Sequence, residues 1–423
     1  MTNTILAAIL VIVVVTLILV ALLLFIKTKL TPSGTVKIDI NDGKKVLDVP
    51  QGGSLLNTLA EQKIFLPSAC GGKGNCGQCK CQVLEGGGSI LPTETGFFTR
   101  KQINDHWRLG CQVKVKDNLK IQVPDSALSV KKLECEVISN KNVATFIKEF
   151  TVRLPEGENI EFKSGEYIQI DIPEYDVAFA DMDVDPIYRG DWEKYGFFDL
   201  KHKNTVPTIR AYSMASYPAE KNVIKLNVRI ATPPFDRSQP RGVFKMLPVP
   251  PGIASTYVFS RKPGDKVWIS GPYGEFLLPK DDPDDMEYIF VGGGAGMAPL
   301  RSHIMHLFKT MRTKREVHFF YGARALVEAF YLEDFAEIEK EFPNFHFHLA
   351  LDRPDPAADA AGVKYTAGFV HNVMNETYLK DHEAPEDIKY FMCGPPMMVS
   401  SVNNLLDSLG VAPESILYDN FGG

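Results

Sequence analysis

The sequence predicts a multidomain fold: one N-terminal transmembrane helix, a small α+β domain, an antiparallel β-barrel and a doubly wound α/β domain. Three observations support this prediction. An apolar run opens the chain, a loop dense in cysteine and glycine follows, and many short strand patterns then give way to alternating strands and helices. The length of 423 residues suits several domains. The expected boundaries are 1–30, 31–128, 129–284 and 285–423.

Charge and cysteine usage exclude some classes of protein. The formal net charge of −6 gives no support to nucleic-acid binding. The seven cysteines are an odd number, and four of them belong to one motif, so they do not form a disulfide framework. The other three are Cys81, Cys135 and Cys393, of which Cys81 and Cys135 are expected to be structural. A reducing compartment is therefore expected.

The apolar run extends from Ile5 to Ile26. About 22 residues at 1.5 Å each span about 33 Å, which is enough to cross a bilayer. A signal peptide fits less well, because no basic residue precedes the run and no A-x-A-like site follows it. Lys27 and Lys29 come directly after the run, so the positive-inside rule places the bulk of the chain in the cytoplasm. We expect a single-pass, membrane-anchored protein.

The cysteine motif reads C-G-G-K-G-N-C-G-Q-C, and a fourth cysteine follows about thirty residues later. Soft thiolates suit an iron–sulfur cluster or a zinc ion, and glycines let the loop turn backbone N–H groups towards sulfur. The first gap is one residue longer than in the plant-type [2Fe–2S] spacing. The spacing therefore leaves both metals open. The predicted ligands are Cys70, Cys76, Cys79 and Cys111.

Strand and turn patterns around this motif predict a small α+β unit. Thr35–Ile40 alternates as a strand, Lys45–Val49 returns, and Ser54 is a suitable N-cap for a helix through Gln62. Lys80–Leu84 is expected to follow the loop as a strand.

Beyond Ser129, short strands without long helices predict a β-barrel. Two inserts, Glu174–Pro207 and Thr232–Pro251, are expected to be irregular functional or docking loops. The predicted strands are Leu133–Ile138, Ile147–Leu154, Tyr167–Ile172, Arg210–Ala215, Val223–Ile230 and Lys266–Ser270.

Alternating strands and helices after Met286 predict a parallel, doubly wound sheet. Tyr288–Val291 leads into the glycines of Gly292–Gly296 and then a helix, and Lys389–Cys393 leads into Gly394-Pro395-Pro396. Glycine turns at the carboxyl ends of two strands can bind a dinucleotide across the sheet. The alternative to a dinucleotide site is that each segment is only a tight turn between a strand and a helix, which requires small residues.

A further motif, Arg210-Ala211-Tyr212-Ser213, lies on a predicted barrel strand. Its arginine can pair with a pyrophosphate, its tyrosine can cover a flavin ring and its serine can reach flavin N5. Gly252-x-x-Ser255 is a small-residue turn that can donate backbone N–H groups to phosphate. By itself, the strand motif is also compatible with ordinary sheet packing.

In this order the motifs resemble the ferredoxin–NADP⁺ reductase superfamily. They are R-A-Y-S, G-I-A-S, G-P-Y-G at Gly271–Gly274, the glycine run and C-G-P. The resemblance implies FAD on the barrel and a nicotinamide nucleotide on the α/β domain. It also implies that Ser213 and Cys393 lie near the reacting atoms, and that Phe421 covers the flavin.

The whole chain is similar to the F subunit of the bacterial sodium-translocating NADH:quinone oxidoreductase. The segments C-G-G-x-G-x-C-G-Q-C-K, G-G-G-A-G-M-A-P and D-N-F-G-G match that family, whose longer first cysteine gap also accounts for the spacing here. The resemblance implies that NADH gives a hydride to FAD and that single electrons pass to a [2Fe–2S] cluster. Partner membrane subunits then reduce quinone at the bacterial inner membrane. The alternatives are a reductase component for an oxygenase and a tethered ferredoxin carrier with a decayed reductase.

The expected site residues follow from these motifs and resemblances. NADH rather than NADPH rests on the resemblance, since Arg324 just past a strand can also suit a 2′-phosphate. Two histidine pairs, His303 with His306 and His346 with His348, lack further ligand signals and are expected to be packed or solvated. The expected catalytic residues are Ser213, Cys393 and Phe421. The expected cofactor-binding residues are Arg210, Ala211, Tyr212, Ser213, Asn227, Arg229, Gly252, Ala254, Ser255, Thr256, Gly293, Gly294, Gly296, Met297, Arg324, Gly394, Pro395 and Phe421.

Overall fold

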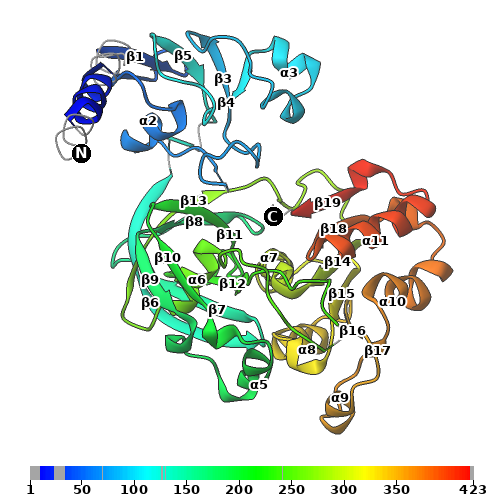
Figure 1. The fold of residues 1–423 in the computed structure, drawn as a ribbon. Coiled ribbons are helices and arrows are strands. Elements are labelled where there is room, and N and C mark those ends of the chain that lie inside the picture. Colours follow the sequence, from blue (N-terminus) through cyan, green and yellow to red (C-terminus); the bar gives the residue numbers. More distant parts are fainter. Residues whose placement is uncertain are drawn as a thin grey trace, which may run out of the picture. The chain divides into compact units, whose positions relative to one another are not determined.

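The computed structural model describes residues 10–22, 34–68, 70–124, 127–128, 130–240 and 242–419. The chain divides into two compact units (Figure 1). One comprises Met1–Ser68 and Gly72–Ser129, and the other comprises Ala69–Gly71 and Val130–Gly423.

Residues 10–22 form a helix whose large apolar side chains are all exposed, between 46% at Val14 and 66% at Leu10. Within the described ranges, no helix has both the length and the apolar character needed to cross a membrane. The rest of the predicted anchor, residues 5–9 and 23–26, lies outside the described residues.

The smaller unit is built on a five-stranded mixed sheet in the order β2-β1-β5-β3-β4. Alternate side chains of β1 are buried, which gives the sheet one apolar face under helix α2. Ser54 caps the start of this helix, as predicted. Its hydroxyl accepts a hydrogen bond from the backbone N–H of Asn57 at 3.3 Å. The elements are β1 (Thr35–Ile40), β2 (Lys45–Pro50), α2 (Leu55–Glu61), β3 (Lys80–Glu85), α3 (Arg100–Asn104), β4 (Trp107–Leu109) and β5 (Leu119–Gln122).

The first part of the larger unit is a six-stranded antiparallel sheet in the order β11-β8-β13-β6-β7-β12. An isolated bridge pairs Met214, the residue after β11, with Leu226 in the middle of β12, so the two edge strands of the sheet also contact each other. The strands are β6 (Lys131–Ala144), β7 (Ile147–Arg153), β8 (Tyr167–Ile172), β11 (Thr208–Ser213), β12 (Val223–Arg229) and β13 (Lys266–Tyr273).

The insert over residues 174–207 is not the irregular loop that its composition predicts. It contains a hairpin of β9 (Tyr175–Ala178) and β10 (Lys201–Asn204) and the helix α5 (Pro186–Lys194). Asp185 caps this helix and a proline occupies its first turn, which together are a typical helix start. The prediction relied on the acidic composition of the insert and did not use this signal. Trp192 is fully buried and donates its indole N–H to the Thr145 carbonyl at 2.8 Å, so the insert extends the barrel core.

The second part of the larger unit is a six-stranded parallel sheet in the order β17-β16-β15-β14-β18-β19. Helices α7 and α8 cover one face and α10 and α11 the other, so the sheet is doubly wound as predicted (Figure 1). The strand order reverses between β14 and β18, the usual place for a ligand. The strands are β14 (Tyr288–Gly293), β15 (Val317–Ala323), β16 (Phe345–Leu351), β17 (Thr366–Ala367), β18 (Lys389–Cys393) and β19 (Ile416–Asp419). The helices are α7 (Met297–Met305), α8 (Leu332–Glu341), α9 (Pro356–Ala360), α10 (Val370–Thr377) and α11 (Pro396–Ser408).

Arg301 on α7 joins the parallel sheet to the barrel. Its buried guanidinium donates to the Ala215 carbonyl at 2.7 Å and forms ion pairs with Glu220 at 3.2 Å and Asp334 at 2.8 Å. The neighbouring Ser302 donates to the Ser216 carbonyl at 2.8 Å. These contacts hold the end of β11 beside α7, and thereby align the two halves of the candidate site.

Lys148 is a charged group inside the barrel, and it predicts a pH dependence of stability. Its side chain is buried, and burial lowers the pKa of its amine to about 8 although the amine donates to the Asn140 and Asp183 carbonyls. The folded state therefore binds fewer protons than the unfolded state between pH 8 and the ordinary lysine pKa of 10.5. We expect stability to rise with pH in that window, by up to about 3 kcal/mol.

The substitution Lys148→Met tests this expectation. The variant should lack the rise, because it has no amine to titrate, and unfolding midpoints measured between pH 7.5 and 10.5 provide the comparison. The same rise in both proteins would show that another group is responsible.

Candidate functional site

The cysteine loop lies in the smaller unit and depends on glycine at two close approaches. Gly74 and Gly77 have φ of +79° and +70°, the left-handed region that other residues avoid. A Cβ on Gly77 would lie 2.4 Å from Cδ1 of Phe97, and one on Gly74 would lie 2.5 Å from Nε2 of Gln112. The left-handed φ of both residues, and the close approach of Gly77 to the Phe97 ring, therefore require glycine.

Three of the four predicted ligands, Cys76, Cys79 and Cys111, belong to this unit. The Cys79 thiol hydrogen-bonds with that of Cys111, and this contact, together with burial, raises the pKa of Cys79. Cys70 falls in the three-residue segment grouped with the other unit, so its place beside the other sulfurs remains a prediction. None of the seven cysteines, all within the described residues, forms a disulfide.

The R-A-Y-S motif lies on β11, an edge strand of the barrel sheet. The Arg210 guanidinium donates to the Thr208 hydroxyl at 2.8 Å and to the Ile209 carbonyl at 2.7 Å. An arginine held by such neutral groups keeps its charge available for a phosphate. Tyr212 is half-buried on the same strand, and burial raises the pKa of its hydroxyl, which therefore stays protonated.

The predicted phosphate turn is the start of helix α6 (Ile253–Ser260). Gly252 is the N-cap and has no side chain to accept from the first amides, so they can face an anion. Ser255 is held in place, accepting from the Ala231 amide at 3.0 Å. A Cβ on Gly252 would lie 2.7 Å from that of Ala231, so the close approach requires glycine. The turn fits a pyrophosphate such as that of FAD.

Asn227 on β12 provides a second observation that points to a ligand. Its amide nitrogen donates to the Tyr331 hydroxyl at 2.8 Å, and that hydroxyl donates to the Glu149 carboxylate at 2.6 Å. Its buried Oδ1 has no hydrogen-bond partner among the described residues. A buried acceptor of this kind can bind a cofactor N–H. Tyr331 and Glu149 position Asn227, and no local motif in the sequence signalled either residue.

The two glycine turns of the parallel sheet meet at its carboxyl edge. Gly292 of β14 pairs in register with Cys393 of β18. A Cβ on Gly296 would lie 2.0 Å from the Cys393 carbonyl oxygen, and one on Gly293 would lie 3.3 Å from Cδ of Pro395. A cavity of about 310 Å³ opens beside this contact. It is lined by Gly394, Pro396, Val399, Ser400, Asn403, Asn404, Tyr418 and Asp419.

Ser213, Cys393 and Asp419 come together where the barrel meets this edge. The Ser213 hydroxyl donates to Oδ2 of Asp419 at 2.6 Å, and Cys393 pairs in register with Asp419 across β18 and β19. Burial raises the pKa of Asp419, against the lowering effect of the Ser213 hydrogen bond. Burial also raises the pKa of Cys393, which therefore remains a thiol. The sequence analysis did not predict Asp419 as a site residue, and the only signal for it was its position two residues before Phe421. Phe421 itself lies outside the described residues.

Arg229, the last residue of β12, and Arg324, the residue after β15, lie near each other. Burial lowers the pKa of Arg229 most, and the charge of Arg324 lowers it further. Two neighbouring guanidinium groups suit a phosphate, which fits their prediction as nucleotide-binding residues.

Comparisons with known proteins identify three domains in this chain. Residues 38–116 match the 2Fe-2S iron-sulfur cluster binding domain, residues 194–277 the oxidoreductase FAD-binding domain, and residues 290–404 the oxidoreductase NAD-binding domain. The F subunit of the Na⁺-translocating NADH-quinone reductase of Pseudomonas aeruginosa is 51% identical over 404 residues, which are 96% of this chain and 95% of the relative. The corresponding protein of Methylococcus capsulatus is 51% identical, covering 94% of each chain.

This chain belongs to the F-subunit family of Na⁺-translocating NADH-quinone reductases. The predicted family and the three predicted cofactor-binding domains are therefore confirmed.

Two solved structures share the fold of this F-subunit family member at low sequence identity. The Amycolatopsis cytochrome P450 reductase GcoB is 22% identical, with a TM-score of 0.62, and covers 92% of this chain and 99% of its own. The ferredoxin reductase in carbazole 1,9a-dioxygenase is 20% identical, with a TM-score of 0.56 and the same coverage. These likenesses indicate a common fold alone.

Proposed function

We propose that this protein is the NADH-oxidising, electron-input component of a sodium-pumping NADH:quinone oxidoreductase. The observation that carries the proposal is identity of about half the residues with F-subunit relatives over nearly the full length of both chains. When bound, FAD accepts a hydride from NADH and releases electrons singly to the [2Fe–2S] cluster. The next electron acceptor and the quinone site are assigned to partner membrane subunits.

The proposed FAD contacts combine the features described above. Arg210 pairs with the pyrophosphate, the first amides of α6 bind a phosphate, and Asn227 accepts from the flavin through its unsatisfied Oδ1. With FAD bound, Tyr212 would lie against the flavin ring, and the family resemblance assigns Phe421 to cover the flavin.

The proposed nicotinamide site is the carboxyl edge of the parallel sheet. The turns at Gly293–Met297 and Gly394–Pro395 pack closely against each other, and the cavity of about 310 Å³ beside them is proposed to take the nucleotide. Arg229 and Arg324 are assigned to a phosphate of the nucleotide.

We propose Cys70, Cys76, Cys79 and Cys111 as the cluster ligands, with domain boundaries at 30/31, 128/129 and 284/285.

Ser213 is proposed to place its hydroxyl beside the reacting atoms, oriented by Asp419. Replacing Ser213 with alanine should slow NADH-driven FAD reduction about 100-fold while leaving FAD content unchanged. Asp419→Asn keeps a hydrogen-bond acceptor but removes the titrating group. In the wild type the reduction rate should fall as the pH drops through the raised pKa of Asp419, and the Asn variant should lack this decline.

Stopped-flow measurement of flavin bleaching across pH tests this role. Ser260→Ala, which removes a hydroxyl bonded to the Tyr257 carbonyl at the far end of α6, is the matched control. An unchanged rate in Ser213→Ala would rule out the proposed role.

Residues 5–26 are proposed to form a single-pass anchor in the bacterial inner membrane, with the bulk of the chain in the cytoplasm. The apolar sequence, in which Thr16 is the one polar residue, and the exposed apolar side chains of helical residues 10–22 support this proposal. The anchor places the [2Fe–2S] domain close to membrane partners.

One experiment tests function and anchor together. Bacterial membranes that contain the full chain and its partner subunits should show sodium-stimulated reduction of quinone by NADH. The large membrane subunits should co-purify with the full chain. A chain lacking residues 1–30 should still reduce an artificial acceptor rapidly but lose quinone reduction. Transfer of electrons to an oxygenase in place of quinone would support the oxygenase-reductase alternative, whereas an inactive flavin site would indicate a simple carrier.

A further inference from the structure

A cluster of three potential metal ligands lies at the amino-terminal edge of the parallel sheet, away from the nucleotide turns. Glu316 directly precedes β15, and His318 lies two residues later on the same strand face. His346 on β16 is the register partner of His318. The pairing of two adjacent parallel strands therefore brings the three side chains together.

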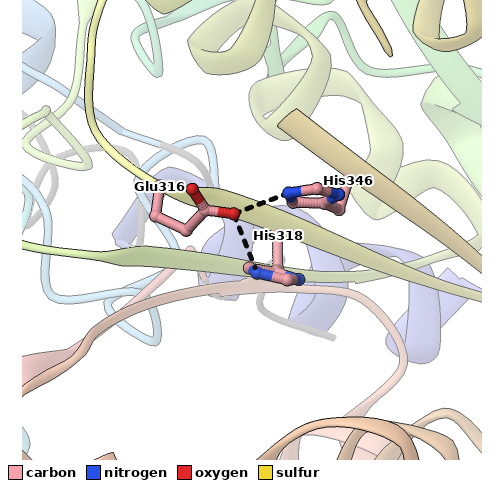
Figure 2. A group of neighbouring side chains, drawn as sticks. All are labelled: Glu316, His318 and His346. Carbon is pink, nitrogen blue, oxygen red and sulfur yellow. Dashed lines mark ion pairs between the residues drawn. The ribbon is translucent and has the colours of Figure 1, made fainter. Parts of the chain in front are cut away.

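Figure 2 shows one carboxylate oxygen of Glu316 directed at both imidazoles. It lies 2.6 Å from Nε2 of His346 and 3.5 Å from Nε2 of His318. The three ligand atoms all lie within 4.8 Å of one another. Ligands about 2.1 Å from a tetrahedral zinc ion are about 3.4 Å apart, so small movements of the half-exposed Glu316 and His346 side chains would complete the geometry.

His318 is already oriented as a metal ligand. Its other ring nitrogen, Nδ1, lies 3.1 Å from Nε2 of His348, which leaves Nε2 of His318 directed at Glu316. Metal-binding histidines usually make such an outer hydrogen bond, which sets the ring orientation and tautomer. The Tyr378 ring packs on His318 with 3.9 Å between ring centroids.

An ion pair between Glu316 and His346 is the simpler explanation, but it leaves His318 unexplained. Nε2 of the buried His318 lies 3.5 Å from the same carboxylate oxygen, at the outer limit of a hydrogen bond, so it converges on Glu316 without a close contact of its own. An imidazole nitrogen aimed at a carboxylate in this way is placed to coordinate a metal together with it.

We propose that Glu316, His318 and His346 form a binding site for a divalent transition-metal ion, with Zn²⁺ the best match. Two imidazoles and one carboxylate are ligands that suit zinc, and the exposed side leaves room for a water ligand. The ion would tie β15 to β16 without obstructing the nucleotide edge.

The test is zinc titration of the full chain with FAD and [2Fe–2S] cluster loaded, so that the cysteines are occupied. Calorimetry should show one Zn²⁺ bound per chain at this site. Binding should weaken at least about 100-fold in His346→Ala and in Glu316→Gln, and about tenfold in His348→Phe. His346 and Glu316 are both more than two-fifths exposed, so these variants should fold normally, which FAD content would verify.

The control is His371→Ala, which removes a histidine of the same domain on α10, and it should bind zinc as the wild type does. Zinc should also raise the thermal midpoint of the wild type and the control by several degrees, but not that of His346→Ala. Equal zinc binding in wild type and His346→Ala, or no zinc uptake by the loaded wild type, would overturn the proposal.

Discussion

Replacing Cys79 with alanine should abolish the electron paramagnetic resonance signal of the reduced [2Fe–2S] cluster and lower electron flow to quinone at least about 100-fold. NADH should still bleach the bound FAD, because the flavin and nicotinamide sites are built on the other unit. Cys79 is buried and its sulfur contacts that of Cys111, another predicted ligand, which is the arrangement expected of two ligands of one cluster. Cys70→Ala is expected to behave in the same way.

Cys81→Ala is the matched control for this experiment. Cys81 lies two residues from Cys79 and is fully buried, and burial raises the pKa of its thiol to about 12, so it stays protonated and inert. The control should keep the cluster signal and the quinone activity. A normal cluster signal in Cys79→Ala would disprove its assignment as a ligand.

Replacing Gly296 with alanine should lower NADH-driven acceptor reduction about 100-fold, since displacements of about 1 Å in a site can have effects of this size. The new Cβ would lie 2.0 Å from the Cys393 carbonyl oxygen and 2.6 Å from the Gly394 amide nitrogen. Both are backbone atoms and cannot rotate away, so the two nucleotide turns must separate.

Steady-state kinetics with NADH and an artificial acceptor measure the Gly296 effect. Dithionite should still reduce the cluster of Gly296→Ala, which shows that the rest of the protein is intact. Gly190→Ala on α5 is the control, because no atom lies within 4 Å of its added Cβ. Unchanged NADH kinetics in Gly296→Ala would show that the two turns do not form the nucleotide site.

The features predicted correctly from the sequence are those encoded within short segments. The cap at Ser54, the period-two burial of β1 and the change from antiparallel to parallel strands after Met286 all depend on neighbouring residues. The cofactor motifs are also local, because glycine is needed wherever backbone must approach a ligand or another backbone closely. Composition was a weaker guide, since it concealed the helix α5 and the buried Trp192 in the first insert.

The features that the sequence did not reveal depend on residues distant in the chain. Ser213 and Asp419 are 206 positions apart, and only the docking of the barrel against β19 brings them to 2.6 Å. The sequence pairs His346 with His348, whereas the parallel register of β15 and β16 places the His346 ring beside that of His318.

The amino-acid sequence therefore predicts the order of domains, the cysteine and glycine motifs and the apolar start of the chain. Each of these depends on the chemistry of residues close together in the sequence. The orientation of Ser213 by Asp419, the support of Asn227 by Tyr331 and the grouping of Glu316, His318 and His346 come from tertiary structure. Each of these contacts depends on how strands pair and helices pack over long separations, which local sequence patterns do not specify.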